Sequence, residues 1–283
     1  MKDAVDRTPL LQRIEHATAL ELFRLKGRVA LVNGAGGRLG SAVATAFAEA
    51  GAHVLLNGRS VAPLQRLQTT LQARGLSSGV VAFDVTDQRA AQYVMRRIRD
   101  EHGRLDILVN NAYSGRSGGP ESVSPGDFAA SYEIAVVAAF RLIKEAHELM
   151  LAAGRAAGHA SVINIASIYG VVSPDPKIYG TSGVDNPPYY GAEKVALIQL
   201  TRYAACHLAP LGIRVNALVP GPFPPPDVLE RHPDFGHALE RRTPLGRTVH
   251  PAELKGAALF LGSDASSYVT GATLAVDGGW TAW

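Results

Sequence analysis

The chain is poor in cysteine, in long apolar runs and in excess charge of either sign. Cys206 is the only cysteine among 283 residues, which excludes an intrachain disulfide and a zinc site built from several cysteines. A single cysteine suits a reducing compartment, and Asp3 and Asp6 precede the first apolar stretch, unlike the residues of a secretory signal peptide. We therefore expect a cytoplasmic protein.

No run of 18 apolar residues is present, so the sequence predicts no membrane-spanning helix. The formal net charge is only +3 and the charged residues are scattered, which argues against a nucleic acid or a membrane surface as partner. Nine histidines lack the spacing of metal ligands, so we expect no bound metal. Apolar residues, in contrast, make up 47% of the chain, enough to bury a large core.

Short apolar segments alternate with stretches of helical periodicity from residue 28 onward. This alternation predicts a single-domain α/β protein, a doubly wound Rossmann fold with a seven-stranded parallel sheet and helices on both faces. The expected strands are 28–33, 53–57, 79–83, 106–110, 161–167, 213–219 and 273–276, and the expected helices are 39–50, 61–74, 87–102, 125–153, 189–209 and 251–262.

Three segments lie outside this alternation. Residues 1–26 carry apolar residues at helical spacing from Leu10 to Phe23, which indicates an N-terminal helical extension of a domain at 27–283. We expect this helix to pack on the domain or on a neighbouring subunit. Two proline-rich stretches follow expected strands, and open parallel sheets bind ligands at the carboxyl ends of their strands. We therefore expect substrate loops at 171–188 and 220–247.

A glycine-rich turn at residues 33–40 joins the first expected strand to the first expected helix. In this context Gly34 permits a tight turn, Gly37 lets the backbone approach a pyrophosphate, and Gly40 lets the helix lie close to the strand. The alternative is an ordinary strand-to-helix turn without a ligand. The candidate cofactor-binding residues of the turn are Gly34, Gly37, Arg38, Leu39 and Gly40.

The end of the second strand predicts which dinucleotide binds. NAD sites place an Asp or Glu there to hold the ribose 2′-hydroxyl, but residues 53–60 contain no carboxylate. Arg59 is instead placed to pair with a 2′-phosphate, which suits the fork of a guanidinium. We therefore favour NADP(H) over NAD(H), with a solvated loop position for Arg59 as the alternative.

Tyr190 and Lys194 lie four residues apart, on one face of an expected helix, and Ser167 ends the fifth expected strand. A tyrosine ordinarily ionises near pH 10, so acid–base work near neutral pH requires a nearby positive charge such as the Lys194 ammonium. A serine hydroxyl can donate to the oxyanion that develops on a carbonyl substrate. The three residues predict a site for hydride-transfer chemistry on an alcohol or ketone.

Together with Asn110-Asn111-Ala112 after the fourth strand and Val-Asp-Gly-Gly-Trp at 276–280, these motifs resemble the classical short-chain dehydrogenase/reductase family over about residues 25–283. The resemblance implies a homo-oligomer, usually a tetramer. The segment 55–59 and the tryptophan-bearing tail are similar to members acting on sugars and aldonates, such as gluconate 5-dehydrogenase. The resemblance to the family further implies that the adenine of the cofactor contacts Asp84 and Val85. The riboses are expected near Asn111, Ala112 and Lys194, and Pro220 and Gly221 are expected to line the nicotinamide pocket.

The chain departs from the family pattern in three places. Arg38 stands where the turn has its middle glycine, as a second phosphate contact or a surface side chain. Ala135 stands where the family has an Asn that helps hold a water beside the lysine. The stretch between Ser167 and Tyr190 is longer than the family norm, and its polar residues are candidate substrate contacts: Tyr169, Asp175, Lys177, Tyr179 and Asp185.

The sequence thus predicts an NADP(H)-dependent oxidoreductase that interconverts a secondary alcohol and a ketone. Tyr190 is the expected acid/base, Ser167 the oxyanion donor and Lys194 the modulating charge. The expected substrate is a small polar molecule, namely a sugar, an aldonate or a polyol. Two alternatives stay open: a reductase of another carbonyl class such as 3-oxoacyl thioesters, and, because of Ala135, a nucleotide-binding protein with little turnover.

Overall fold

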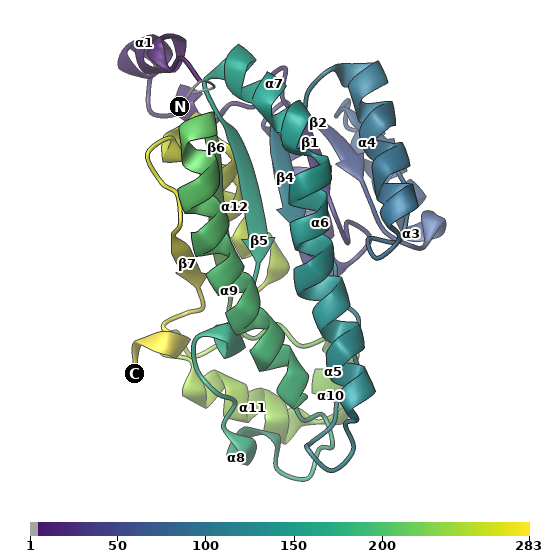
Figure 1. Cartoon of the computed structure of the whole chain (residues 1–283). Coiled ribbons are helices and arrows are strands. Elements are labelled where there is room, and N and C mark those ends of the chain that lie inside the picture. The colour runs from purple at the N-terminus through teal and green to yellow at the C-terminus, as the bar shows by residue number, and fades with distance from the viewer. Residues whose placement is uncertain (1–4) are drawn as a thin grey trace.

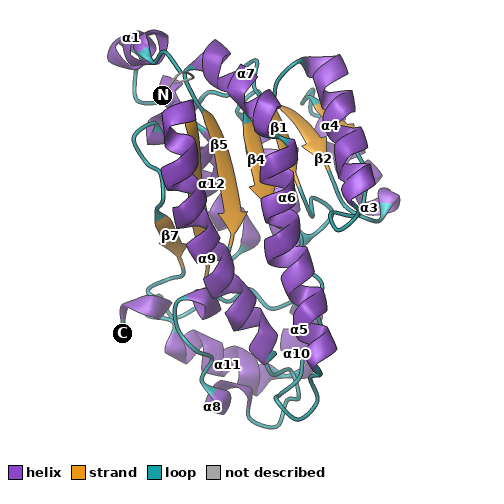
Figure 2. Ribbon diagram, in the orientation of Figure 1, coloured by secondary structure: helices purple, strands orange, loops and turns teal. Residues whose placement is uncertain are grey.

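Seven parallel strands form one sheet in the computed structural model, which describes residues 5–283 (Figures 1 and 2). The strand order is β3-β2-β1-β4-β5-β6-β7, which confirms the expected doubly wound fold. Each strand lies within a few residues of its expected place, although the third ends at Val80 rather than at 83. The strands are β1 (Val29–Val32), β2 (His53–Leu56), β3 (Ser78–Val80), β4 (Ile107–Asn110), β5 (Ala160–Ile165), β6 (Ile213–Pro220) and β7 (Thr273–Val276).

Helices cover both faces of the sheet, because the central strands bury side chains on both sides. In β4, for example, Leu108 packs in the core of one face, whereas Ile107 and Val109 pack in the core of the other. Within residues 5–283, no helix is both long and apolar enough to cross a membrane. One face carries α2 (Arg38–Glu49), α3 (Val61–Gln72) and α12 (Leu254–Gly262), and the other carries α4 (Gln88–His102), α6 (Ala138–Glu145), α7 (His147–Ala157) and α9 (Pro188–Leu208).

The loops that form the site lie at the carboxyl edge of the sheet. The strand order reverses between β1 and β4, and open parallel sheets bind ligands at such a reversal. Three short helices lie beyond this edge, opposite the end that carries α1 (Figure 1). They are α8 (Pro176–Tyr179), α10 (Pro226–Arg231) and α11 (Pro233–Arg242), and they belong to the two expected substrate loops.

The helix expected at 125–153 is interrupted, so that prediction was wrong in detail. It consists of α5 (Pro125–Tyr132), a π-helical turn at Glu133–Val137, α6 and α7. The backbone N–H of Ala138 donates to the carbonyl of Glu133, five residues earlier, and this pairing inserts one extra residue into the helix. The extra residue rotates the face that α6 presents relative to that of α5.

The N-terminal extension contains a shorter helix than its apolar spacing predicted. Helix α1 (Thr8–His16) ends because the carboxylate of Glu21 accepts hydrogen bonds from the backbone N–H and the hydroxyl of Thr18, which stabilises a separate turn. Leu10 is buried, whereas Leu20 is 81% exposed. Residues 1–4 of the expected extension lie outside the described residues.

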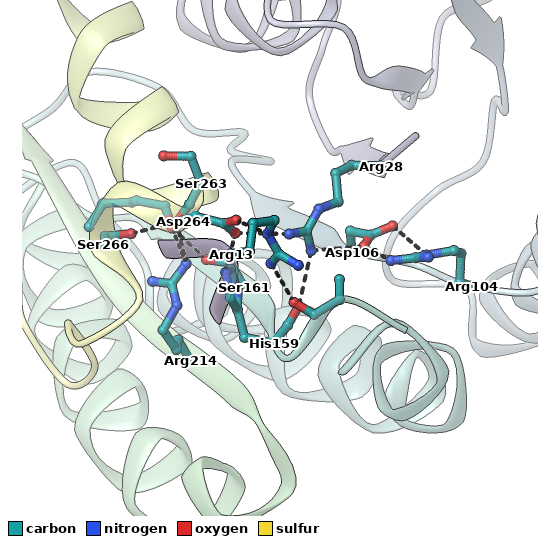
Figure 3. Close-up of polar contacts among 12 residues, drawn as sticks. Arg13, Arg28, Arg104, Asp106, His159, Ser161, Arg214, Ser263, Asp264 and Ser266 are labelled. Atoms are coloured by element: carbon teal, nitrogen blue, oxygen red, sulfur yellow. Dashed lines mark hydrogen bonds and ion pairs between the residues drawn. The ribbon is translucent and has the colours of Figure 1, made fainter. Parts of the chain in front are cut away.

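Asp264 binds Arg13 of the N-terminal extension and so attaches the extension to the domain (Figure 3). Its carboxylate accepts a hydrogen bond from Nε of Arg13 at 2.7 Å and from Nη2 of Arg28 at 2.8 Å, and lies 2.8 Å from Nε2 of His159. Burial acts to raise the pKa of Asp264, but hydrogen bonds from His159 and Arg13 and the charge of Arg28 together lower it well below its ordinary value. The extension therefore packs on the domain itself, at the amino ends of the strands.

Candidate active site

A cavity of about 670 Å³ opens at the carboxyl edge of the sheet, and a second cavity of about 90 Å³ lies beside it. Gly34 and Tyr113 line both, so the two cavities adjoin. The sequence-predicted residues on the large cavity are Gly34, Gly37, Arg38, Leu39, Gly40, Asn111, Ser167, Tyr169, Tyr179, Tyr190, Lys194, Pro220 and Gly221. Those on the small cavity are Gly34, Arg59, Asp84, Val85 and Ala112.

The glycine turn after β1 is held by close backbone contacts. Gly34 has a φ of +66°, and a Cβ atom there would lie 2.8 Å from Nδ2 of Asn111. A Cβ atom on Gly40 would lie 2.1 Å from the carbonyl oxygen of Gly34, so α2 and the turn approach as closely as only glycine permits. Gly37 precedes α2 and no side chain caps this helix, so its first N–H groups are available to an anion. A dinucleotide pyrophosphate fits this turn.

Arg38 points toward the loop that follows β6. Its guanidinium donates hydrogen bonds to the carbonyl oxygens of Phe223 at 2.9 Å and of Pro224 at 2.8 Å. Arg38 also lines the large cavity, so a phosphate contact for it stays a prediction. The structure adds a contact that the sequence did not suggest, between the glycine turn and the second substrate loop.

Arg59 is the cation of the small cavity. Its Nη2 lies 3.5 Å from Oγ of Ser114, which also lines this cavity. The nearest acidic candidate, Asp84, has one carboxylate oxygen occupied by the backbone N–H and the hydroxyl of Thr86. Burial acts to raise the pKa of Asp84, but the Thr86 hydrogen bonds and the charge of Arg59 lower it. The small cavity can therefore accept an anionic group beside Arg59.

Ser167, Tyr190 and Lys194 all line the large cavity. Ser167 follows β5, is buried, and accepts a hydrogen bond on Oγ from the N–H of Tyr169 at 3.2 Å. Tyr190 and Lys194 lie one turn apart near the start of α9, with Nζ of Lys194 5.3 Å from the centre of the Tyr190 ring. The hydroxyl hydrogen of Ser167 is free to donate while Oγ accepts, so the three groups suit proton transfer at a carbonyl.

Two residues of the site were missed from the sequence. Glu193 is 1% exposed, and its Oε1 lies 3.4 Å from Nζ of Lys194. Its position between Tyr190 and Lys194 on one helix face was a usable signal, since residues three and four apart are neighbours. Tyr113 packs edge-on against Tyr190, with ring centres 5.0 Å apart, and no local pattern indicated that contact.

Ala135 occupies the position at which the family has an Asn. It is buried in the π-helical turn and lines a cavity of about 10 Å³ that also contacts Lys194, Asn33 and Asn110. A buried amide chain passes beside this cavity, because Asn33 donates to Asn110 at 3.3 Å and Asn110 donates to Asn164 at 2.8 Å. Position 135 therefore does lie near the lysine, as its place in the sequence predicted.

The loop at 171–188 brings only part of its expected residues to the cavity. The hydroxyl of Tyr179 donates to that of Tyr169 at 2.9 Å, and both residues line the cavity. Asp175 instead caps α8 by accepting from the N–H of Lys177, whose side chain is exposed. The backbone carbonyl of Asp185 accepts from Gly118. Asp175, Lys177 and Asp185 do not line the cavity, so substrate contacts for them stay predictions that this geometry does not support.

Comparison with known proteins agrees with this architecture. A family model described as enoyl-(acyl carrier protein) reductase matches residues 34–281. Gluconate 5-dehydrogenase of Gluconobacter oxydans is 36% identical over 264 residues, which cover 92% of this chain and 97% of that protein. Galactitol 2-dehydrogenase (L-tagatose-forming) of Cereibacter sphaeroides is 35% identical over 264 residues, covering 93% and 98%. The crystal structure of a gluconate 5-dehydrogenase from Burkholderia cenocepacia J2315 in complex with NADP and tartrate superposes with a TM-score of 0.82, at 32% identity, covering 94% of this chain and 100% of that one.

These matches and the fold define an oxidoreductase. The chain belongs to the short-chain dehydrogenase/reductase family, whose members act on CH–OH groups and the corresponding carbonyls.

Proposed function

We propose that the protein is an NADP(H)-dependent oxidoreductase that interconverts a secondary alcohol and a ketone. The observation that carries the proposal is that Ser167, Tyr190 and Lys194 line the same cavity as the glycine turn. A bound nicotinamide would accept or supply the hydride. Tyr190 exchanges the proton with the substrate oxygen, Ser167 donates a hydrogen bond to that oxygen, and the Lys194 ammonium stabilises the ionised tyrosine.

NADP(H) is favoured over NAD(H) because of the charges around the small cavity. Arg59 is a cation on its wall, whereas Asp84 has one carboxylate oxygen occupied by Thr86. Asn57, at the end of β2, uses its amide to hold the carbonyls of Val81 and Phe83. A 2′-phosphate thus has a cationic partner here, whereas residues 53–60 at the end of β2 offer no carboxylate to a 2′-hydroxyl. The Burkholderia relative with bound NADP supports this assignment.

The substrate is proposed to be a small, uncharged, hydroxylated molecule, a polyol or a sugar. Among residues 5–283, no carboxylate lines the large cavity, and its only cations are Arg38, bonded to the second loop, and Lys194, beside Tyr190. An aldonate would therefore lack a counter-charge at the substrate end. Tyr169 and Ser117 offer hydroxyl groups there, and Oδ1 of Asn186 is buried without a hydrogen-bond partner among residues 5–283. The galactitol-oxidising relative supports the same class.

A panel of substrates tests the proposal through the absorbance of the reduced nicotinamide. We expect galactitol to be oxidised with NADP⁺ at a higher kcat/KM than gluconate. The apolar side chains of Val228, Phe235 and Leu239 on the cavity wall make a 3-oxoacyl thioester the competing substrate. Faster reduction of that thioester would replace the polyol assignment. Tight NADPH binding without turnover on any member of the panel would favour a binding protein.

A further inference from the structure

Lys194 is a buried cation with one carboxylate beside it. The residue is 4% exposed, and its Nζ lies 3.5 Å from the carbonyl oxygen of Ile165. Among residues 5–283, the only acidic group within 4.0 Å of Nζ is Glu193, at 3.4 Å. A charge removed from water requires such a partner, since an unpaired buried charge destabilises the fold strongly.

Glu193 is held in place by a second helix. Its Oε2 accepts a hydrogen bond from the hydroxyl of Ser131 on α5, and Ser131 is itself buried. Its Oε1, which faces Lys194, has no hydrogen-bond partner among the described residues. Burial raises the pKa of Glu193, while the charge of Lys194 and the Ser131 hydroxyl act to lower it. An apolar residue in place of Glu193 alone would leave the buried Lys194 ammonium unpaired, so the carboxylate is tied to the ammonium that lies beside Tyr190.

We propose that Glu193 is a positioning residue that tunes Tyr190 through Lys194. Tyr190, Glu193 and Lys194 occupy positions i, i+3 and i+4 of α9, which places them on one face. The Glu193 carboxylate orients the Lys194 ammonium and partly neutralises it, and so sets how strongly the ammonium stabilises ionised Tyr190. This inference rests on the proposed function, in which Tyr190 exchanges the proton.

The charged and titratable neighbours of this pair are few. Tyr113, after β4, has a pKa raised by burial and by Tyr189, Tyr190 and Glu193, so it is neutral at working pH. Tyr169, after β5, also has a pKa raised by burial. On α5, Asp127 accepts hydrogen bonds from Ser124 and Arg116, and Tyr132 is exposed. Glu133 in the π-helical turn is paired with Arg141 at 2.7 Å, and Arg214 on β6 donates to the carbonyls of Leu261 and Ser263.

Glu193→Gln tests the proposal because it keeps the size and the Ser131 contact and removes the charge. The full-length enzyme is assayed with NADP⁺ and its best alcohol over a range of pH. The acid limb of the kcat/KM profile should move to lower pH by about one pH unit, because the Lys194 ammonium then acts on Tyr190 without neutralisation. The matched control is Glu145→Gln on α6, which removes a carboxylate hydrogen-bonded to Gln92 and should leave the profile in place.

An unshifted acid limb in Glu193→Gln would overturn the proposal and leave Glu193 a structural role. Should this variant fail to fold, Ser131→Ala takes its place, since loss of the hydroxyl favours the protonated carboxyl. The acid limb should then shift in the same direction by less, and no shift would again overturn the proposal. Tyr190→Phe distinguishes a failure of the proposed function from a failure of the role proposed for Glu193. Wild-type turnover in Tyr190→Phe would refute the proposed function itself.

Discussion

Arg38 and Phe223 are joined by two different contacts. The guanidinium of Arg38 donates to the carbonyl oxygen of Phe223 at 2.9 Å and lies over the phenyl ring, 5.7 Å from its centre. The bond to Pro224 at 2.8 Å extends the contact by one residue. The glycine turn and the loop after β6 are therefore directly connected at the edge of the large cavity.

Arg38→Ala should loosen the loop at 221–232. The lost hydrogen bonds are solvent-exposed and worth about 1 kcal/mol in total, so amide exchange in this loop should accelerate by about five-fold. Hydrogen–deuterium exchange with mass spectrometry measures the change, and Arg38→Lys, which keeps the charge without the planar fork, is the control. Unchanged exchange together with weaker NADPH binding would instead identify Arg38 as a phosphate ligand.

Arg59→Ala should weaken NADPH binding and leave NADH binding unchanged. A charge-assisted hydrogen bond to the 2′-phosphate is worth about 1.5–3 kcal/mol, or about 10- to 150-fold in Kd. Titration of both cofactors by nicotinamide fluorescence gives the ratio. Equal affinity of the wild-type protein for NADH and NADPH would contradict the cofactor assignment.

Tyr190→Phe removes one hydroxyl and keeps the ring that packs against Tyr113. Turnover should fall by at least about 10²-fold, the scale of a general acid or base, while the Kd for NADPH changes little. Steady-state kinetics and cofactor titration on the same preparation separate the two effects. A variant with near wild-type turnover would mean that another group transfers the proton.

Ala135→Asn should lower stability without raising the rate. The cavity beside Ala135 holds only about 10 Å³, so the added amide overpacks it at a cost of about 1–3 kcal/mol. Tm should drop by several degrees in thermal unfolding, at about 2–4 °C per kcal/mol for a chain of this size. A faster turnover with a smaller solvent isotope effect would show instead that proton exchange at Lys194 limits the wild-type enzyme.

Stability should fall on mild acidification because of His159. Burial lowers the pKa of His159 from 6.5 to about 4, so the folded protein keeps it neutral while the unfolded chain binds a proton. The stability it contributes is present above pH 6.5 and is lost as the pH falls toward 4. Urea unfolding at pH 5 should give a free energy about 2 kcal/mol lower than at pH 7. In His159→Gln the free energy of unfolding should differ less between pH 7 and pH 5. An equal decrease in the variant would mean that other groups cause the pH dependence.

The parts of the fold set by local pattern were predictable, and those set by distant contacts were not. The buried strands, the turn at Gly34 and the pair Tyr190 and Lys194 each follow from spacing within a short segment. The π-helical turn keeps the apolar pattern of an α-helix, so periodicity could not reveal it. The position of Glu193 is fixed in part by Ser131, 62 residues away in the sequence, which no local pattern reveals. Asp175 was predicted as a substrate contact, but in the structure it caps α8, and an Asp before a proline at a helix start is a capping pattern.

The bond between Arg13 and Asp264 joins residues 251 positions apart in the sequence. During synthesis Arg13 leaves the ribosome 251 residues before its partner Asp264 is made. The bond from Arg13 to the carbonyl of Ala157 can form earlier, but the ion pair that completes the attachment of α1 waits until β1 to β6 have been translated. A chain shortened before Asp264 should therefore hold α1 less firmly, and limited proteolysis beside α1 should cut it faster than the full chain.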